Sequence, residues 1–136
     1  MDRESTEQFI HENFGGILAD QPWDDLPEYT VFRHADNHKW FALVATVSYA
    51  TLAKQNPARF SRLSNLNLSD PVNFINLKSD PDLIEEATKL DGILPAYHMN
   101  KRHWLTVLLD GSCEPEKVKH LITLSYRLTS QKRRTS

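Results

Sequence analysis

The stretch HWLTVLLD, residues 103–110, is the clearest β-strand in the sequence. Successive side chains of a strand point to opposite faces. The two faces carry mainly apolar residues, with one set formed by Leu105, Val107 and Leu109 and the other by Trp104, Thr106 and Leu108. A strand that is apolar on both sides is covered on both sides, so we expect it inside a sheet.

The segments around this strand have helix and turn signals. Asp110 and Gly111 predict a turn, and Pro115 opens a last helix whose buried stripe is formed by Val118, Leu121, Ile122, Ser125 and Leu128. Upstream, residues 72–78 alternate as another strand. Asp80 and Pro81 then start a helix that we expect to run to about Asp91, with Gly92 in the left-handed conformation beyond its end.

The first half of the chain predicts a helix and a hairpin. Ser5, with Gln8 three positions later, fits a capping box, and we expect Phe9, Ile10, Phe14, Ile17 and Leu18 on the apolar side of this helix. Residues 29–34 and 39–47 flank a polar connection short enough for a hairpin loop. In the second strand, simple alternation puts Phe41 on the face of Leu43 and opposite Ala42. Residues 48–71 are interrupted by prolines and asparagines, and we expect a loop-rich insertion there.

This order of elements predicts a two-layer α+β domain, in which helices pack on an antiparallel sheet. A chain of 136 residues with 40% hydrophobic and 25% charged residues fits a single domain over 1–136, with a basic tail at about 131–136. The lone cysteine, Cys113, cannot form an internal disulfide. Neither an apolar stretch of membrane-spanning length nor a secretory leader is visible, so we expect a cytoplasmic protein.

Charge is distributed unevenly along the chain. Residues 1–96 hold 8 basic and 15 acidic side chains, whereas residues 97–136 hold 8 basic and 3 acidic ones, giving −7 and +5. A basic C-terminal part is consistent with a nucleic-acid partner. A solvated helix followed by a basic tail would give the same balance.

Two short segments combine cations, histidine and tryptophan at the start of a strand. They are residues 97–104 (YHMNKRHW) and residues 37–40 (NHKW). Paired wings of this kind could bring cations to phosphates and an aromatic plane to a base. Alternatively, Trp40 and Trp104 are mostly buried at the sheet edge and the cations only extend over them. The wing hypothesis requires Lys39 and Lys101 to lie near one another on the same sheet edge.

Other site chemistries have weaker support. The histidine spacings, such as His98 with His103, match no metal-binding pattern, and neither Cys113 nor Ser125 has an evident activating base. The acidic residues before position 26 are typical of a solvated face. We therefore predict no catalytic set, no cofactor and no metal.

Four blocks of the sequence resemble the MmcQ/YjbR-like family: residues 29–42, residues 76–81 (NLKSDP), the octad at 97–104, and residues 125–128 (SYRL). The resemblance implies a CyaY-like, secretion-chaperone-like α+β domain and a DNA-binding role of double-wing type. It brings no catalytic residues with it. The segment 48–71 is longer than is usual in the family.

The sequence therefore predicts a non-enzymatic module that binds DNA weakly and without sequence preference, as a monomer or weak dimer with no membrane association. The candidate nucleic-acid-binding residues are Arg33, Lys39, Trp40, Lys78, His98, Asn100, Lys101, Arg102, His103 and Trp104. Two alternatives stay open. One is a protein-interaction or chaperone-like adaptor that uses the sheet face, and the other is a frataxin-like acidic iron site on the first helix.

Overall fold

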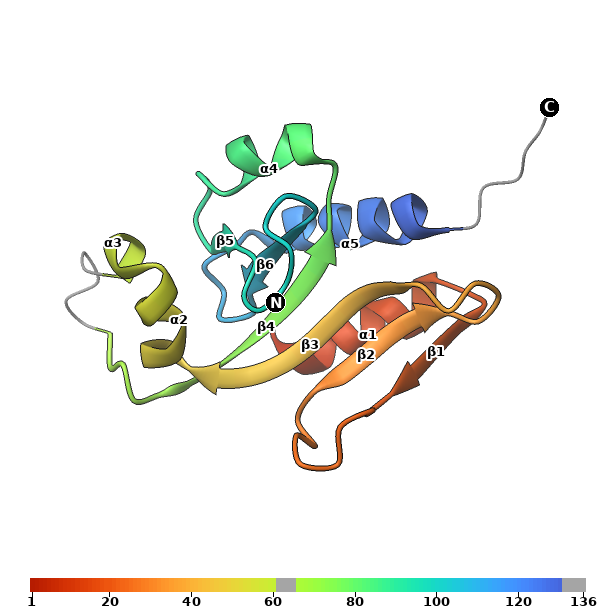
Figure 1. The fold of residues 1–136 in the computed structure, drawn as a ribbon, viewed down its shortest axis with the longest axis horizontal. Coiled ribbons are helices and arrows are strands. Elements are labelled where there is room, and N and C mark those ends of the chain that lie inside the picture. Colours follow the sequence, from red (N-terminus) through yellow and green to blue (C-terminus); the bar gives the residue numbers. More distant parts are fainter. Residues whose placement is uncertain (61–65, 131–136) are drawn as a thin grey trace.

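A computed structural model describes residues 1–60 and 66–130. Within these residues one sheet has the strand order β1-β2-β3-β4-β6-β5, and every neighbouring pair is antiparallel. The strands are β1 (Ile17–Asp20), β2 (Thr30–His34), β3 (Trp40–Ser48), β4 (Pro71–Lys78), β5 (Ile93–Pro95) and β6 (Trp104–Leu108). The predicted antiparallel sheet is therefore confirmed (Figure 1).

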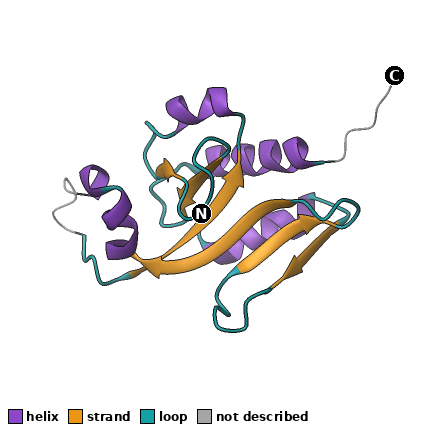
Figure 2. Ribbon diagram, in the orientation of Figure 1, coloured by secondary structure: helices purple, strands orange, loops and turns teal. Residues whose placement is uncertain are grey.

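The helices are unevenly distributed over the sheet (Figure 2). They are α1 (Arg3–Asn13), α2 (Tyr49–Gln55), α3 (Pro57–Phe60), α4 (Pro81–Ala87) and α5 (Pro115–Thr129). Helices α1 and α5 pack on one face, whereas α2 and α3 lie at the end of the sheet where β3 stops and β4 begins. The α+β class predicted from the element order is confirmed. None of the described helices is both long and apolar enough to span a bilayer.

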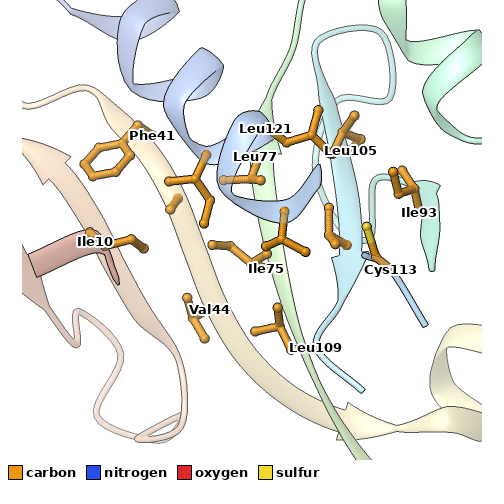
Figure 3. Close-up of a cluster of buried hydrophobic side chains, with 14 of the residues drawn as sticks. Ile10, Phe41, Val44, Ile75, Leu77, Ile93, Leu105, Leu109, Cys113 and Leu121 are labelled. Carbon is orange, nitrogen blue, oxygen red and sulfur yellow. The ribbon is translucent and has the colours of Figure 1, made fainter. Parts of the chain in front are cut away.

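Two apolar clusters hold the helices to the sheet. On the face of α1 and α5, Ile10 and Leu121 pack with strand residues such as Val44, Ile75 and Leu105, all at most 6% exposed (Figure 3). On the other face, a smaller cluster joins α2 and α3 to the sheet through residues that include Tyr49, Leu52, Phe60, Phe74, Tyr97 and Leu108. The second face is therefore packed at the α2 end of the sheet, away from the starts of β3 and β6.

The N-terminal helix begins earlier than the sequence predicts. Asp2 is its N-cap, and Ser5 is the partner in a capping box in which Ser5 N–H donates to Asp2 Oδ1 at 2.8 Å and Asp2 N–H donates to Ser5 Oγ at 3.1 Å. The prediction of Ser5 as the N-cap was wrong, because Asp2 with Ser5 and Ser5 with Gln8 both have the spacing of a capping box. Ile17 and Leu18 were also wrongly placed in the helix. They begin β1, after Gly16 takes a φ of 64° that turns the chain back along β2.

The insertion at residues 48–71 is not simply a loop. The Ser48 hydroxyl accepts from Thr51 N–H at 3.2 Å and caps α2, and Pro57 opens the short α3. The prediction of a loop-rich insertion was incomplete because each helix is only one or two turns long, too short for a periodic apolar pattern. Residues 61–65 of the insertion lie outside the described residues, as does the basic tail at 131–136.

Two further boundaries differ from the prediction. Helix α4 ends at Ala87 rather than near Asp91, and Leu90, which the predicted helix included, is 45% exposed. Gly92 does have a positive φ of 80°, but it leads into β5, where a Cβ would lie 2.7 Å from Cys113 N. In α5 the expected buried stripe is correct except at Leu128, which is 49% exposed, while Thr129 is buried.

A β-bulge changes the face of the sheet on which one aromatic side chain lies. The register between β2 and β3 shifts between the pairs Phe32–Ala42 and Arg33–Trp40, leaving Phe41 as an extra residue. Phe41 consequently packs in the same cluster as Ala42 and Val44, not on the face of Leu43 as simple alternation predicts. Trp40, the residue before the bulge, pairs with Arg33.

Candidate nucleic-acid interface

The first candidate loop, residues 35–39, joins β2 to β3. Asn37 Oδ1 accepts from Lys39 N–H at 2.8 Å, and Asn37 Nδ2 donates to the Thr129 carbonyl of α5 at 2.9 Å. His38 adopts a φ of 61°, a conformation that closes the turn. This loop is thereby tied to α5, with Lys39 exposed and Trp40 starting the next strand.

The second candidate loop, residues 96–103, joins β5 to β6 and repeats this geometry. Asn100 Oδ1 accepts from Arg102 N–H at 2.8 Å, and the Asn100 carbonyl accepts from Trp104 N–H at 2.9 Å. His98 has a φ of 58°, and its ring centroid lies 4.0 Å from that of Tyr97. Each loop therefore contains an asparagine turn that presents a cation one position (Lys39) or two positions (Arg102) before a tryptophan-led strand.

A buried polar network fastens the second loop to the sheet. Asn76 Nδ2 donates to the Tyr97 carbonyl at 2.9 Å, Thr106 Oγ1 donates to Asn76 Oδ1 at 2.5 Å, and Tyr97 N–H donates to Thr106 Oγ1 at 2.9 Å. Asn76 and Thr106 are both 0% exposed. Because each bond satisfies a buried group, the network holds the start of the loop in one position.

The last residues of β4 are held by α5. The Ser125 hydroxyl accepts from Lys78 N–H at 2.9 Å and donates to the Phe41 carbonyl at 2.5 Å. It thus bridges β3 and β4 beyond their last register pair, Ala42 with Leu77. Ser79 N–H then donates to the His103 carbonyl at 2.9 Å, which joins the same end of β4 to the second loop.

These connections gather residues from four segments around an open hollow of about 340 Å³, which we call the indole hollow. It is lined by His38, Lys39, Trp40, Lys78, Trp104, Leu128 and Thr129. Lys78 Nζ lies 5.7 Å from the Trp104 ring centroid, a cation–π distance. On the other side, Trp40 meets Trp23 edge to face, with 5.8 Å between the ring centroids.

The wing hypothesis is supported in one respect and corrected in another. Strands β3 and β6 run in the same direction with β4 between them, so both loops lie at one end of the sheet (Figure 1). They are interior strands, however, and Lys39 and Lys101 do not lie at a sheet edge. Both Trp40 and Trp104 are partly buried, so each keeps some exposed surface.

The other candidate residues have different surroundings. Lys101 and Arg102 are exposed on the second loop and, with His98, Asn100 and His103, are not among the described residues that line the hollow. Arg33 forms an ion pair with Asp20 of β1, so its charge is already partnered. Asn100 acts through its turn and His103 through its carbonyl, which gives both residues a structural role.

Sequence reasoning missed two residues that shape this region. Trp23 comes from the turn-rich segment before β2 and supports the Trp40 ring, but nothing in its local sequence indicates that contact. Ser125 was placed on the buried stripe of the last helix and considered as a nucleophile, but not as a hydrogen-bonding partner of main-chain groups. The apolar residues around it on the predicted buried stripe were the available signal that its hydroxyl satisfies main-chain groups.

The described residues offer neither an activated cysteine nor a cluster of metal ligands. Cys113 is 3% exposed, and burial raises the pKa of its thiol, which disfavours the reactive thiolate. Across residues 1–60 and 66–130, no group of three or more His, Cys, Asp or Glu side chains could hold a metal ion.

Two further depressions are present, and the one between α4 and α5 adjoins the hollow because Lys78 and Leu128 line both. A cavity of about 540 Å³ at the α2 end includes Tyr49, Arg59 and Asp110 in its lining, with Tyr49 Oη donating to Asp110 Oδ2 at 2.7 Å. A groove of about 150 Å³ between α4 and α5 is lined mainly by leucines, including Leu83 and Leu128, which are 51% and 49% exposed.

The sequence matches the YjbR family over residues 13–128. The chain belongs to the YjbR family. It is 29% identical over 127 residues to the uncharacterised protein YyaQ of Bacillus subtilis, covering 93% of this chain and 97% of that protein. It is 37% identical over 54 residues to the uncharacterised protein YjbR of Escherichia coli K12, covering 39% of this chain and 46% of that protein. The resemblance found in the sequence blocks is thus confirmed, and these YjbR-family relatives carry no assigned activity.

Solved structures of related proteins have the same fold. A crystal structure of a Pseudomonas syringae protein superposes with a TM-score of 0.78 at 35% identity, covering 96% of this chain and 100% of that one. The DR2400 protein of Deinococcus radiodurans, with a DUF419 domain, superposes with a TM-score of 0.65 at 27% identity, covering 96% of this chain and 80% of that one. The fold of this chain is therefore shared with these two bacterial proteins.

Proposed function

We propose that this YjbR-family protein is a non-enzymatic module that binds DNA through the end of the sheet where the two candidate loops lie. The observation that carries the proposal is the indole hollow, where Lys39, Trp40, Lys78 and Trp104 meet from three strands and a loop. Exposed Lys101 and Arg102 lie on the neighbouring loop. Cations of this kind bind phosphates, and the indoles offer surfaces for bases or sugars.

The available charges support weak rather than tight binding. Within residues 1–60 and 66–130, Lys39, Lys78, Lys101 and Arg102 form none of the observed ion pairs, so their charges are available to a polyanion. The whole chain nevertheless has a formal charge of −2. A few phosphate contacts on such a protein give binding that is salt-sensitive and indifferent to base sequence.

Fluorescence anisotropy with a labelled duplex, titrated at several salt concentrations, tests the proposal. Replacing Lys39, Lys101 and Arg102 by Ala removes three phosphate contacts if all are made. The slope of log affinity against log salt should then flatten by about 3, since each duplex contact contributes ~0.9. Binding should weaken alike for unrelated duplex sequences.

Matched controls distinguish binding at this surface from attraction of DNA to positive charges elsewhere on the protein. Lys54, Lys89 and Lys117 lie outside the hollow, and replacing all three by Ala removes the same charge. That variant should bind duplex nearly as well as the unmodified chain. A deletion of Lys132, Arg133 and Arg134 tests the tail separately. Failure to bind at low salt, or binding abolished by the deletion and untouched by the first triple variant, would refute the proposal.

A second candidate function is a protein-interaction adaptor, and the leucine-lined groove between α4 and α5 favours it. We expected the sheet face to serve this role, but α2, α3 and Tyr97 pack on part of that face. Exposed Leu83 and Leu128 beside the groove are the kind of apolar surface that protein contacts bury. Sedimentation equilibrium tests self-association: a dimer that Leu128→Glu dissociates would support this function, and a monomer at high concentration would count against a homodimer.

A further inference from the structure

The indole hollow has features suited to an unpaired base rather than to a duplex. Trp40 and Trp104 start β3 and β6, which are separated by β4 alone. Adjacent strands are ~4.8 Å apart, so the two indoles arise from backbones roughly 10 Å apart. A base is flat, so it can stack against the exposed surface of one of these indoles.

We propose that the hollow binds a single unpaired base of single-stranded nucleic acid, with the flanking phosphates held by the surrounding cations. This inference rests on the proposed function and names its preferred substrate. Its basis is that aromatic and cationic side chains line the same depression: Trp40 and Trp104 with Lys39 and Lys78. The volume of about 340 Å³ is at the lower end of the ~300–1,000 Å³ typical of small-molecule sites, which suits a nucleobase.

Stacking distinguishes the two forms of nucleic acid. In a duplex, both faces of a base are covered by its neighbours, whereas a base in a single strand can leave the stack and lie on an aromatic side chain. A partly exposed indole therefore adds affinity for a single strand that it cannot add for an intact duplex. Phosphate-binding cations such as Lys101 and Arg102, by contrast, serve both forms.

The hollow is also held in shape before any ligand binds. Ser125 fixes the backbone of Lys78, the Asn37 side chain ties the first loop to α5, and Trp23 supports one side of the Trp40 ring. Lys78 Nζ already lies near the Trp104 ring, so a cation is positioned beside the aromatic surface. Such preorganisation reduces the entropy lost when a base is bound.

The test compares one labelled oligonucleotide of about 12 nucleotides, a length within the usual range for such sites, with its duplex at equal salt. Anisotropy gives the affinities, and intrinsic tryptophan fluorescence reports stacking without any substitution. We expect tighter binding of the single strand and quenching by it alone. Trp104→Leu should weaken single-strand binding about 5- to 150-fold, the equivalent of ~1–3 kcal/mol for one stacked base, and so reduce or abolish the preference for the single strand over the duplex.

Two variants guard against a folding artefact. Trp104→Phe keeps an aromatic face and should restore most of the affinity that Trp104→Leu loses, because every base can stack on a phenyl ring. Lys54→Ala, on α2 at the opposite end of the sheet, is the charge control. Thermal melts monitored by circular dichroism confirm that each variant is folded. If Trp104→Leu does not fold, Trp40→Leu and the quenching of the unmodified chain supply the readout.

The outcomes separate this inference from the proposed function. Equal affinity for both forms, no quenching and no effect of Trp104→Leu, with the triple cation variant still weakening binding, would overturn the base site and leave DNA binding intact. Absence of binding to either form at low salt would overturn both.

Discussion

The Ser125 bridge between β3 and β4 gives a quantitative test of how α5 holds the candidate interface. The Ser125 side chain is 0% exposed, and its hydroxyl is bonded to Lys78 N–H at 2.9 Å and to the Phe41 carbonyl at 2.5 Å. Ser125→Ala leaves both main-chain groups without this partner. An unsatisfied buried group costs about 1–3 kcal/mol, while alanine recovers up to ~0.5 kcal/mol of helix propensity.

For two such groups the expected loss is therefore about 1.5–5.5 kcal/mol of unfolding free energy, which for a domain of this size lowers the melting temperature by roughly 5–27 °C. Urea unfolding followed by circular dichroism measures the free energy, and differential scanning calorimetry measures the temperature. Thr123→Ala is the matched control on the same helix. Its hydroxyl bonds only the Lys119 carbonyl one turn back, at 2.9 Å, so its removal should change stability by less than ~0.5 kcal/mol.

A loss below ~1 kcal/mol for Ser125→Ala, with an unchanged dependence on urea, would refute this reasoning. It would mean that water or a local shift satisfies Lys78 N–H and the Phe41 carbonyl equally well. Ser125 would then have no part in positioning the end of β4.

Four further predictions concern stability and titration. Trp104→Ala should cost ~1.5–3 kcal/mol in urea unfolding, because the indole is only partly buried, and a loss above ~4 kcal/mol would instead indicate the mostly buried indole of the alternative to the wing hypothesis. Burial lowers the pKa of His34, whose Nε2 lies 2.9 Å from Thr129 Oγ1, so the unfolded chain takes up a proton more readily. Stability should be complete above the model-compound pKa of 6.5 and fall as the pH drops below it, and His34→Gln should flatten that dependence in urea midpoints measured across this range. Asn76→Ala should speed amide hydrogen exchange across the second loop, since the carbonyl of Tyr97 loses its donor, and unchanged exchange would contradict the anchoring role. Burial acts to raise the pKa of Asp110, but hydrogen bonds from Ser112 and Tyr49 outweigh it and lower the pKa, so Tyr49→Phe should raise this value in a carboxyl NMR titration.

The candidate site was predictable in composition but not in arrangement. The residues that line the hollow include Lys39, Trp40, Lys78 and Trp104, all named from the sequence because cations and tryptophans stand at strand ends. Arg33 was named for the same reason, yet its ion pair with Asp20 depends on β1, a strand that the sequence did not indicate. A charge is available or paired according to its neighbours across strands, and those neighbours are distant in sequence.

Local chemistry in the sequence was enough to determine the longer elements. Strands β2, β3, β4 and β6 alternate over five or more residues, and α5 has a full apolar stripe, so their periodicity is visible without tertiary context. Asp80 as the cap of α4 and Gly92 in a left-handed conformation are equally local, because they depend on one side chain or on the absence of one.

Tertiary structure alone decided the remainder. The four-residue β1 and three-residue β5 exist because β2 and β6 supply hydrogen-bonding partners, and elements this short have too few residues to show a period. The bulge at Phe41 reverses one side chain through the register of the neighbouring strand. The hollow itself forms where the ends of β3, β4 and β6 meet the end of α5. Trp40, Lys78 and Trp104 are 26 to 64 positions apart in the sequence, so their meeting is not visible until the sheet is assembled.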